Sequence, residues 1–102
     1  MTHRVVFAPE ADAQLTALYR YIEIQASPSI AKRFTDAILS RCEDLADMPF
    51  QGTPRDDIRP GMRTLAYKRR VLIAYDVEDE IVTIIAVFYG GQDFESLLRE
   101  DS

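Results

Sequence analysis

Side chains able to act as nucleophiles or as general acids and bases are scarce in this sequence. The one histidine is His3 and the one cysteine is Cys42, so a Ser-His-Asp or Cys-His site would have to use a histidine in the third position. We expect His3 to be a solvated strand residue and Cys42 to be a packed small hydrophobe. Two such residues are also too few for a zinc site, and one cysteine cannot form an internal disulfide. The sequence therefore predicts no catalytic residue, no bound metal and no cofactor.

Carboxylates and glycines are the other groups that could do chemistry. Asp56-Asp57 lies in a predicted loop and Glu78-Asp79-Glu80 in a predicted tight turn, where charge is usually solvated, so neither indicates a hydrolase. Gly90-Gly91 follows a predicted strand but lacks the G-x-G-x-x-G or G-K-S/T spacing of a phosphate-binding loop.

The distribution of charge is more informative than any single residue. Seventeen acidic and twelve basic residues give a net charge of -5, the wrong sign for a protein that coats nucleic acid. Residues 55–70 nevertheless hold six basic and two acidic residues, whereas residues 76–102 hold eight acidic residues and one basic residue. A basic strip on an acidic body suits an acidic peptide or a selected phosphate. The alternative is that these bases neutralise the domain's own carboxylates.

A single α+β domain over residues 1–102 must position these groups, because a chain of 102 residues is too short for two cores. A short strand is expected at Val5-Val6-Phe7, followed by a helix from Pro9 to Ala26. Ser27-Pro28 is a capping serine followed by a proline at the first helical position, which predicts a second helix that folds back and ends near Met48. The core stripe predicted for this helix consists of Ile30, Phe34, Ala37, Ile38 and Leu45. A loop over 49–61 then leads to an antiparallel meander of strands at 62–67, 70–77 and 81–89.

The first predicted helix has more apolar surface than a two-layer domain needs. One stripe at three- and four-residue spacing forms the expected core face: Ala11, Leu15, Leu18, Tyr19 and Ile22. A second apolar patch, well away from that stripe, predicts a surface for a partner and consists of Ala13, Ala17, Tyr21 and Ile24.

The last predicted strand is apolar on both sides, which predicts a central strand with both faces covered. One face would hold Ile81, Ile85, Val87 and Tyr89, and the other Val82, Ile84, Ala86 and Phe88. We expect the helices to cover one face. The other would be covered by a partner or by the carboxy-terminal tail, where Asp93 could cap a short helix presenting Phe94, Leu97 and Leu98. The longest mostly apolar stretch, residues 81–89, is too short to span a membrane.

Several segments in this order resemble the RelE/ParE toxin superfamily over nearly the whole chain: the Ser-Pro-jointed hairpin, Gly52, Arg55, the run from Arg59 to Arg63, residues 71–77 and residues 81–93. The resemblance implies a short first strand, an amino-terminal helical hairpin packed on an antiparallel sheet, and a short carboxy-terminal tail or helix. It also implies a cytoplasmic bacterial toxin of a type II toxin-antitoxin module.

The superfamily holds two activities. RelE-like members cut messenger RNA on the ribosome with several basic residues, aided in many members by a tyrosine or histidine. The matching regions here read Arg63, Leu65, Leu72 and Gly90-Gly91-Gln92, so only one expected base remains. The resemblance therefore implies the ParE branch, whose members bind and poison DNA gyrase without enzymatic activity, although usual ParE members carry a histidine and arginines where this chain has residues 89–92.

The resemblance leaves two alternatives open. One is a ribosome-dependent mRNA endonuclease that uses Arg63 with help from Tyr67 or Tyr89. The other is a degenerate, non-toxic member that still binds its antitoxin.

The resemblance also implies a partner, a ParD-type antitoxin whose carboxy-terminal segment folds on the toxin. The patch formed by Ala13, Ala17, Tyr21 and Ile24 is where such an amphipathic segment would bury its apolar side. Local charge alone selects the candidate target-binding residues Arg59, Arg63, Lys68 and Arg69. We expect no direct specific nucleic-acid binding and no membrane contact.

Overall fold

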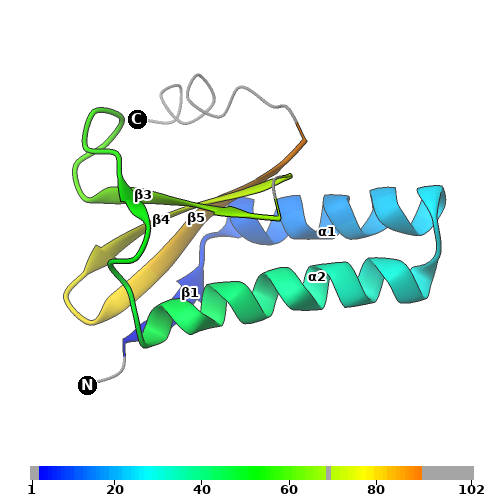
Figure 1. Cartoon of the computed structure of the whole chain (residues 1–102), viewed down its shortest axis with the longest axis horizontal. Coiled ribbons are helices and arrows are strands. Elements are labelled where there is room, and N and C mark those ends of the chain that lie inside the picture. Colours follow the sequence, from blue (N-terminus) through cyan, green and yellow to red (C-terminus); the bar gives the residue numbers. More distant parts are fainter. Residues whose placement is uncertain (1–2, 69, 91–102) are drawn as a thin grey trace.

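The computed structural model describes residues 3–68 and 70–90, which form two layers (Figure 1). One layer is a hairpin of two helices, and the other is a five-stranded sheet in the order β1-β5-β4-β3-β2. The elements are β1 (Arg4–Phe7), α1 (Pro9–Gln25), α2 (Pro28–Glu43), the 3-10 helix η1 (Asp44–Ala46), β2 (Thr53–Pro54), β3 (Met62–Tyr67), β4 (Val71–Glu78) and β5 (Ile81–Tyr89). The α+β class and the amino-terminal helical hairpin are confirmed.

The sheet is mixed rather than wholly antiparallel. The predicted meander is present, since β3 pairs antiparallel with β4 and β4 with β5. β1 lies parallel to β5, with Arg4 opposite Ile81 and Phe7 opposite Ile84. The segment predicted as a loop over 49–61 contains β2, which pairs with β3. A proline is tolerated in β2 because this strand is at the edge of the sheet.

The start signals of both helices act as predicted. Pro9 stands at the start of α1, and the Ser27 side chain caps α2 by accepting a hydrogen bond of 3.2 Å from the Ile30 N–H. The core face of α1 is also confirmed, because Ala11, Leu15, Leu18 and Ile22 are buried, whereas Tyr19 is half-buried.

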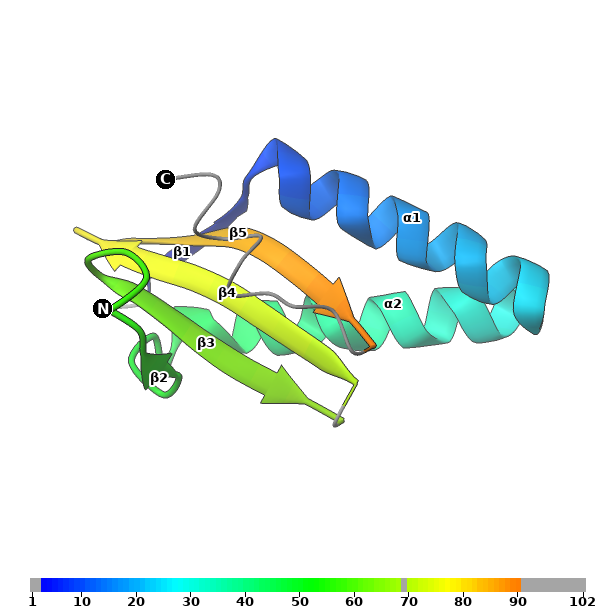
Figure 2. The ribbon, with the colours of Figure 1, turned by 90° about the horizontal axis from the view of Figure 1, so that it is seen from above.

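The prediction for the end of the second helix was wrong. α2 ends at Glu43 rather than near Met48, and a turn of 3-10 helix follows it. Its buried positions are Ala31, Thr35, Ile38 and Cys42, whereas Ile30, predicted to be in the core, is 44% exposed. The hairpin extends beyond the ends of the strands (Figures 1 and 2), so its tip has no sheet to pack on.

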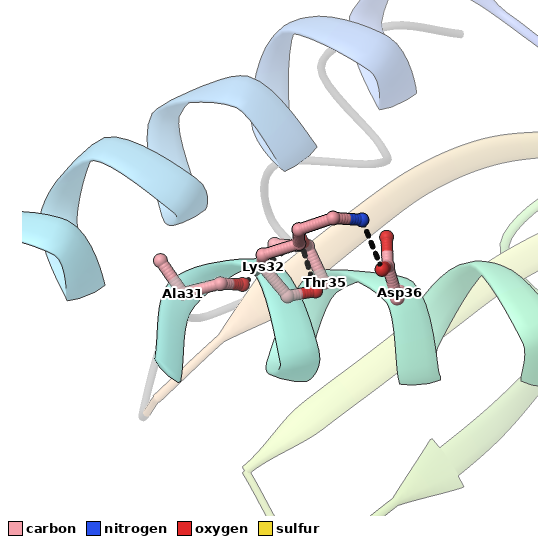
Figure 3. A network of polar contacts seen from close by, with 4 residues as sticks. All are labelled: Ala31, Lys32, Thr35 and Asp36. Carbon is pink, nitrogen blue, oxygen red and sulfur yellow. Dashed lines mark hydrogen bonds and ion pairs between the residues drawn. The ribbon is translucent and has the colours of Figure 1, made fainter. Parts of the chain in front are cut away.

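A polar residue lies within the buried face of α2. The Thr35 hydroxyl donates a hydrogen bond of 2.9 Å to the Ala31 carbonyl, which satisfies the hydroxyl inside the core (Figure 3). On the solvent side of the same turn, Lys32 Nζ lies 2.7 Å from Asp36 Oδ2.

A β-bulge in β5 overturns the predicted division of this strand into two faces. Ala74 pairs with Ala86 while its neighbour Tyr75 pairs with Ile84, so Ile85 is an extra residue on β5. An extra residue reverses the alternation of side chains beyond it. Val82 and Ile84 therefore share the helix-facing core with Val87, and Ile85 lies with Ala86 and Phe88 on the other face.

The face of the sheet away from the helices has its own buried cluster. It includes Met62, Ala74 and Phe88, and it also includes Ile58, which comes from the segment before β3. The predicted cover from a tail helix with Asp93, Phe94, Leu97 and Leu98 lies outside the described residues. Within the residues that the structure describes, no helix is long and apolar enough to cross a membrane.

Candidate functional site

A groove of about 530 Å³ lies between α1 and the end of the sheet; we call it the α1 groove. On the helix side it is lined by Gln14, Ala17 and Tyr21, and on the sheet side by Arg70, Val87 and Tyr89. The groove arises because β1 ends at Phe7, opposite Ile84, while β5 continues to Tyr89. Past the end of β1, α1 rather than another strand lies beside β5 (Figure 2).

Gln14 joins the two walls of the α1 groove. Its Oε1 accepts a hydrogen bond of 2.7 Å from the Val87 N–H, which satisfies a backbone donor of β5 beyond the reach of β1. The sequence analysis missed Gln14, Arg70, Val87 and Tyr89. Arg70 belongs to the basic stretch that the sequence singled out, but the pairing of β1 beside β5 is a long-range event with no local signal.

The structure places the four candidate antitoxin-binding residues on the solvent-facing side of α1. Ala13 and Ala17 are exposed, Tyr21 is 54% exposed and Ile24 is 79% exposed. Ala17 and Tyr21 line the α1 groove, whereas Ala13 and Ile24 do not.

Arg63 and Tyr75 hold the chain that follows η1 onto the sheet. They are paired residues on neighbouring strands, so their side chains lie on the same face. Tyr75 Oη donates a hydrogen bond of 2.8 Å to the Pro49 carbonyl and accepts one of 2.9 Å from the Gly52 N–H. Arg63 Nη1 donates to the carbonyls of Phe50 (2.9 Å) and Gly52 (2.7 Å).

Two further features make this contact tight. The Arg63 guanidinium carbon lies 5.1 Å from the centre of the Phe50 ring, within the range of a cation–π contact. A Cβ on Gly52 would lie 2.6 Å from Tyr75 Oη and 2.9 Å from the Thr64 carbonyl, so this position requires glycine. Burial raises the pKa of the Tyr75 phenol, while the Gly52 N–H and the charges of Arg63 and Arg41 act in the opposite direction.

The basic residues before β3 face acidic groups of the same domain. Arg55 forms a two-pronged contact with the Asp57 carboxylate, with hydrogen bonds of 3.0 and 2.9 Å. Burial raises the pKa of the Asp76 carboxyl and the charge of Glu78 raises it further, whereas the charge of Arg59 opposes both. Arg55 therefore pairs with a carboxylate of its own domain, and the charge of Arg59 acts on a second one.

The four candidate target-binding residues do not all come together. Arg59 lies in the segment before β3, Arg63 is the second residue of β3, and Lys68 lies in the turn after its end. Five residues of extended strand separate Arg63 from Lys68, which is roughly 16 Å. Lys68 is exposed, with Nζ 5.5 Å from the centre of the Tyr67 ring. Arg69 lies outside the described residues.

The structure also places the two residues considered for nucleophilic chemistry, His3 and Cys42. His3 is half-buried rather than solvated, with its ring 6.3 Å from that of Phe50 in an edge-on contact. Cys42 is fully buried, as expected, and burial raises the pKa of its thiol to about 12. Over residues 3–68 and 70–90, no group of three His, Cys, Asp or Glu side chains could hold a metal ion.

Solved structures with this fold include toxin-antitoxin complexes. The chain is similar to one from the "Chromosomal ParDE TA system from P. aeruginosa", with a TM-score of 0.76 and 22% identity over 87% of this chain and 97% of that one. It is also similar to a chain of the toxin-antitoxin complex RelBE2 from Mycobacterium tuberculosis, with a TM-score of 0.66 and 20% identity over 87% and 99% of the two chains. These likenesses confirm the fold. Comparison with curated proteins found no match.

Sequence comparison adds the family. The model of the family described as "ParE toxin of type II toxin-antitoxin system, parDE" matches residues 5–94, which is most of the chain and includes both helices and all of the strands except the first residue of β1. The chain therefore belongs to the ParE toxin family of type II toxin-antitoxin systems.

Proposed function

We propose that this ParE-family toxin acts by binding rather than by catalysis, that its target is DNA gyrase, and that a cognate ParD-type antitoxin holds it inactive. The proposal that the toxin is not an enzyme is supported mainly by the position of Arg63. This arginine is the single base left where the resemblance to RelE-like members leads us to expect several. Its guanidinium already donates to two backbone carbonyls and stacks on Phe50.

An arginine that stabilises the charge of a reacting phosphate must be able to reach that phosphate. Arg63 could offer Nη1 to a phosphate only by releasing the carbonyls of Phe50 and Gly52, which would leave both without this donor. The nearby Tyr75 hydroxyl is buried and bonded on both sides, so it is poorly placed for proton transfer. These contacts support a structural role for the pair.

Antitoxin binding is proposed at the α1 groove and on the exposed residues beside it. An apolar patch on the outside of a helix, next to a groove, is the kind of surface that receives an amphipathic segment. Tyr21 and Ile24 each expose more than half of their side chain, which supports a partner that covers them. Ala13 and Ala17 are small enough to let such a segment approach the helix closely.

The antitoxin contact can be tested with Tyr21→Asp, to which Ile24→Asp can be added. Met48→Asp is the matched control, because Met48 is 64% exposed but follows η1, whereas the groove is lined by residues of α1, of the β3–β4 turn and of the end of β5. We expect the protein encoded beside this gene to co-purify with the wild type and the control, and to be lost from the Tyr21→Asp variant. If Tyr21→Asp retains the partner as well as Met48→Asp does, the proposed antitoxin site is wrong.

Target contact is proposed for Arg59, Arg63, Lys68 and Arg69, which are grouped by charge. Lys68 is the most accessible of those that the structure describes, since Arg59 faces Asp76 and Arg63 holds the loop. We expect the purified toxin to inhibit supercoiling by gyrase, Lys68→Glu to weaken this inhibition, and Lys32→Glu to leave it unchanged. Lys32 is a suitable control because it is also an exposed lysine and its charge already meets Asp36.

The same preparations separate the alternative functions. Cleavage of messenger RNA in a translating extract that disappears in Arg63→Ala would favour the ribosome-dependent endonuclease. Normal growth after induction without antitoxin would favour the non-toxic member. Full supercoiling activity of gyrase at saturating toxin would rule out the proposed target.

A further inference from the structure

A second cleft, of about 250 Å³, lies on the other side of the β3–β4 turn from the α1 groove; we call it the α2 cleft. It is lined by Ile30, Arg33, Phe34 and Ala37 of α2 and by Lys68 of the turn. The cleft therefore combines apolar lining residues with two cations, Arg33 and Lys68. Ile30, which the sequence analysis assigned to the core, contributes to this cleft instead.

An aromatic row connects the α2 cleft to the α1 groove. The Tyr89 ring lies 6.3 Å from the ring of Tyr21, in the groove, and 5.9 Å from the ring of Phe34, in the cleft. Tyr89 is the last residue of β5, at the end of the sheet beyond which the helical hairpin continues (Figure 2). The two hollows are thus neighbours joined by apolar surface.

The charge around these hollows is opposite to that of the chain as a whole. The described residues that line them include Arg33, Lys68 and Arg70 and no acidic side chain, in a chain of net charge -5. Ion pairs between described residues include Lys32–Asp36, Arg41–Asp44 and Arg55–Asp57. None of these pairs involves the three cations of the hollows. A partner with carboxylates would supply the missing countercharge.

We propose that the α2 cleft is a second docking site for the antitoxin, and that it receives an acidic and apolar segment continuing from the segment in the α1 groove. This inference rests on the proposed function. The partner segment would carry aspartate or glutamate opposite Arg33, Lys68 and Arg70, and aliphatic side chains on Phe34 and on Ile30. Its path would cross the turn between β3 and β4 above Tyr89.

This path would explain how the antitoxin inactivates the toxin. Lys68 is both a wall of the α2 cleft and the most accessible of the candidate target contacts. An antitoxin that pairs a carboxylate with Lys68 removes this cation from the surface available to the target. An antitoxin confined to the α1 groove would leave Lys68 exposed.

The test compares two adjacent basic residues on α2. Arg33→Glu places a carboxylate in the α2 cleft, whereas Lys32→Glu makes the same change of charge one residue away, at a side chain that does not line the cleft and pairs with Asp36 (Figure 3). The probe is the full-length protein encoded beside this gene, labelled with fluorescein, and binding to each full-length toxin variant is measured by anisotropy. Far-ultraviolet circular dichroism verifies that the variants are folded.

We expect Arg33→Glu and Lys68→Glu each to weaken binding by about tenfold or more, because like charges facing each other at an interface cost several kcal/mol. We expect Lys32→Glu to change the dissociation constant by less than about threefold, because Lys32 is an exposed charge that does not line the cleft. If Arg33→Glu matches Lys32→Glu while Tyr21→Asp still abolishes binding, the antitoxin ends in the α1 groove and this inference is wrong, although the proposed function stands. If neither Arg33→Glu nor Tyr21→Asp weakens binding, both are wrong.

Discussion

Removing one buried oxygen, in the variant Tyr75→Phe, should cost a large fraction of the stability of this domain. Tyr75 is fully buried, and its hydroxyl makes two hydrogen bonds, to the Pro49 carbonyl and from the Gly52 N–H. Phenylalanine keeps the ring in place but leaves both backbone groups without this partner. Each lost hydrogen bond costs about 1 kcal/mol net, so we expect the free energy of unfolding to fall by about 2 kcal/mol. For a domain of this size, that is a fall in Tm of roughly 8–16 °C.

Chemical denaturation followed by circular dichroism measures this loss directly. Tyr21→Phe is the matched control, because Tyr21 is 54% exposed and its change should move the free energy of unfolding by less than about 0.5 kcal/mol. If Tyr75→Phe loses no more free energy of unfolding than the control does, the role assigned to the Tyr75 hydroxyl is wrong. It would mean that the chain from Pro49 to Gly52 is not fastened by this hydroxyl, and the structural role of the neighbouring Arg63 would need to be reconsidered.

Three further predictions concern stability. Gly52→Ala should destabilise the fold by about 1–3 kcal/mol, because its Cβ would lie 2.6 Å from Tyr75 Oη and 2.9 Å from the Thr64 carbonyl. In thermal melts, the double variant Gly52→Ala with Tyr75→Phe should lose less stability than the sum of the two single variants. Ser27→Ala should cost about 1 kcal/mol by removing the cap of α2, whereas Ser40→Ala, at an exposed position within this helix, should cost less than about 0.5 kcal/mol; equal losses would contradict the cap. The thiol of Cys42 keeps its proton up to a pKa of about 12 in the folded state and about 9.0 in the unfolded state, so the native protein binds more protons in between and stability falls as pH rises through that window. Between about pH 8 and pH 10.5, urea denaturation should show about 2 kcal/mol more loss in the wild type than in Cys42→Ala, and parallel curves would contradict the burial of the thiol.

Local signals predicted the elements of this fold well. Ser27-Pro28 starts α2 with the expected cap, and the four buried residues of α1 are members of the predicted stripe. The bounds predicted for β3 and β5 agree with the structure. Caps and periodic apolar residues act within one element, so a single sequence can reveal them.

The features that the sequence analysis predicted wrongly or missed all depend on contacts between distant segments. The bulge at Ile85 is defined only by its pairing with β4, and it moved half of β5 to the other face. Ile30 looks like a core residue because its spacing matches Phe34 and Ile38, but it lies in the first turn of α2, next to the connection between the two helices, and is 44% exposed. The sequence singled out Arg63 only as a base and did not single out Tyr75, and only the return of Pro49–Gly52 against these two residues reveals their structural role.

The candidate site shows the same limit. The exposed patch on α1 was predicted because it is a property of one helix, and its exposure is confirmed. The α1 groove requires that β1 stop short beside β5, and the α2 cleft requires that the β3–β4 turn lie against α2. Neither arrangement has a local signature, so the cations that line these hollows could be recognised as a basic stretch but not placed.

The central claim is that this toxin works by occupying its target and performs no turnover of RNA. The most direct test adds the purified toxin to a translating extract at a concentration well below that of the ribosomes, and follows the messenger RNA by primer extension over time. We predict intact messenger RNA throughout, because Arg63, the one base left where RelE-like members have several, donates to the carbonyls of Phe50 and Gly52. Cleavage that accumulates to many cuts per toxin molecule, and that stops in Arg63→Ala, would contradict the claim.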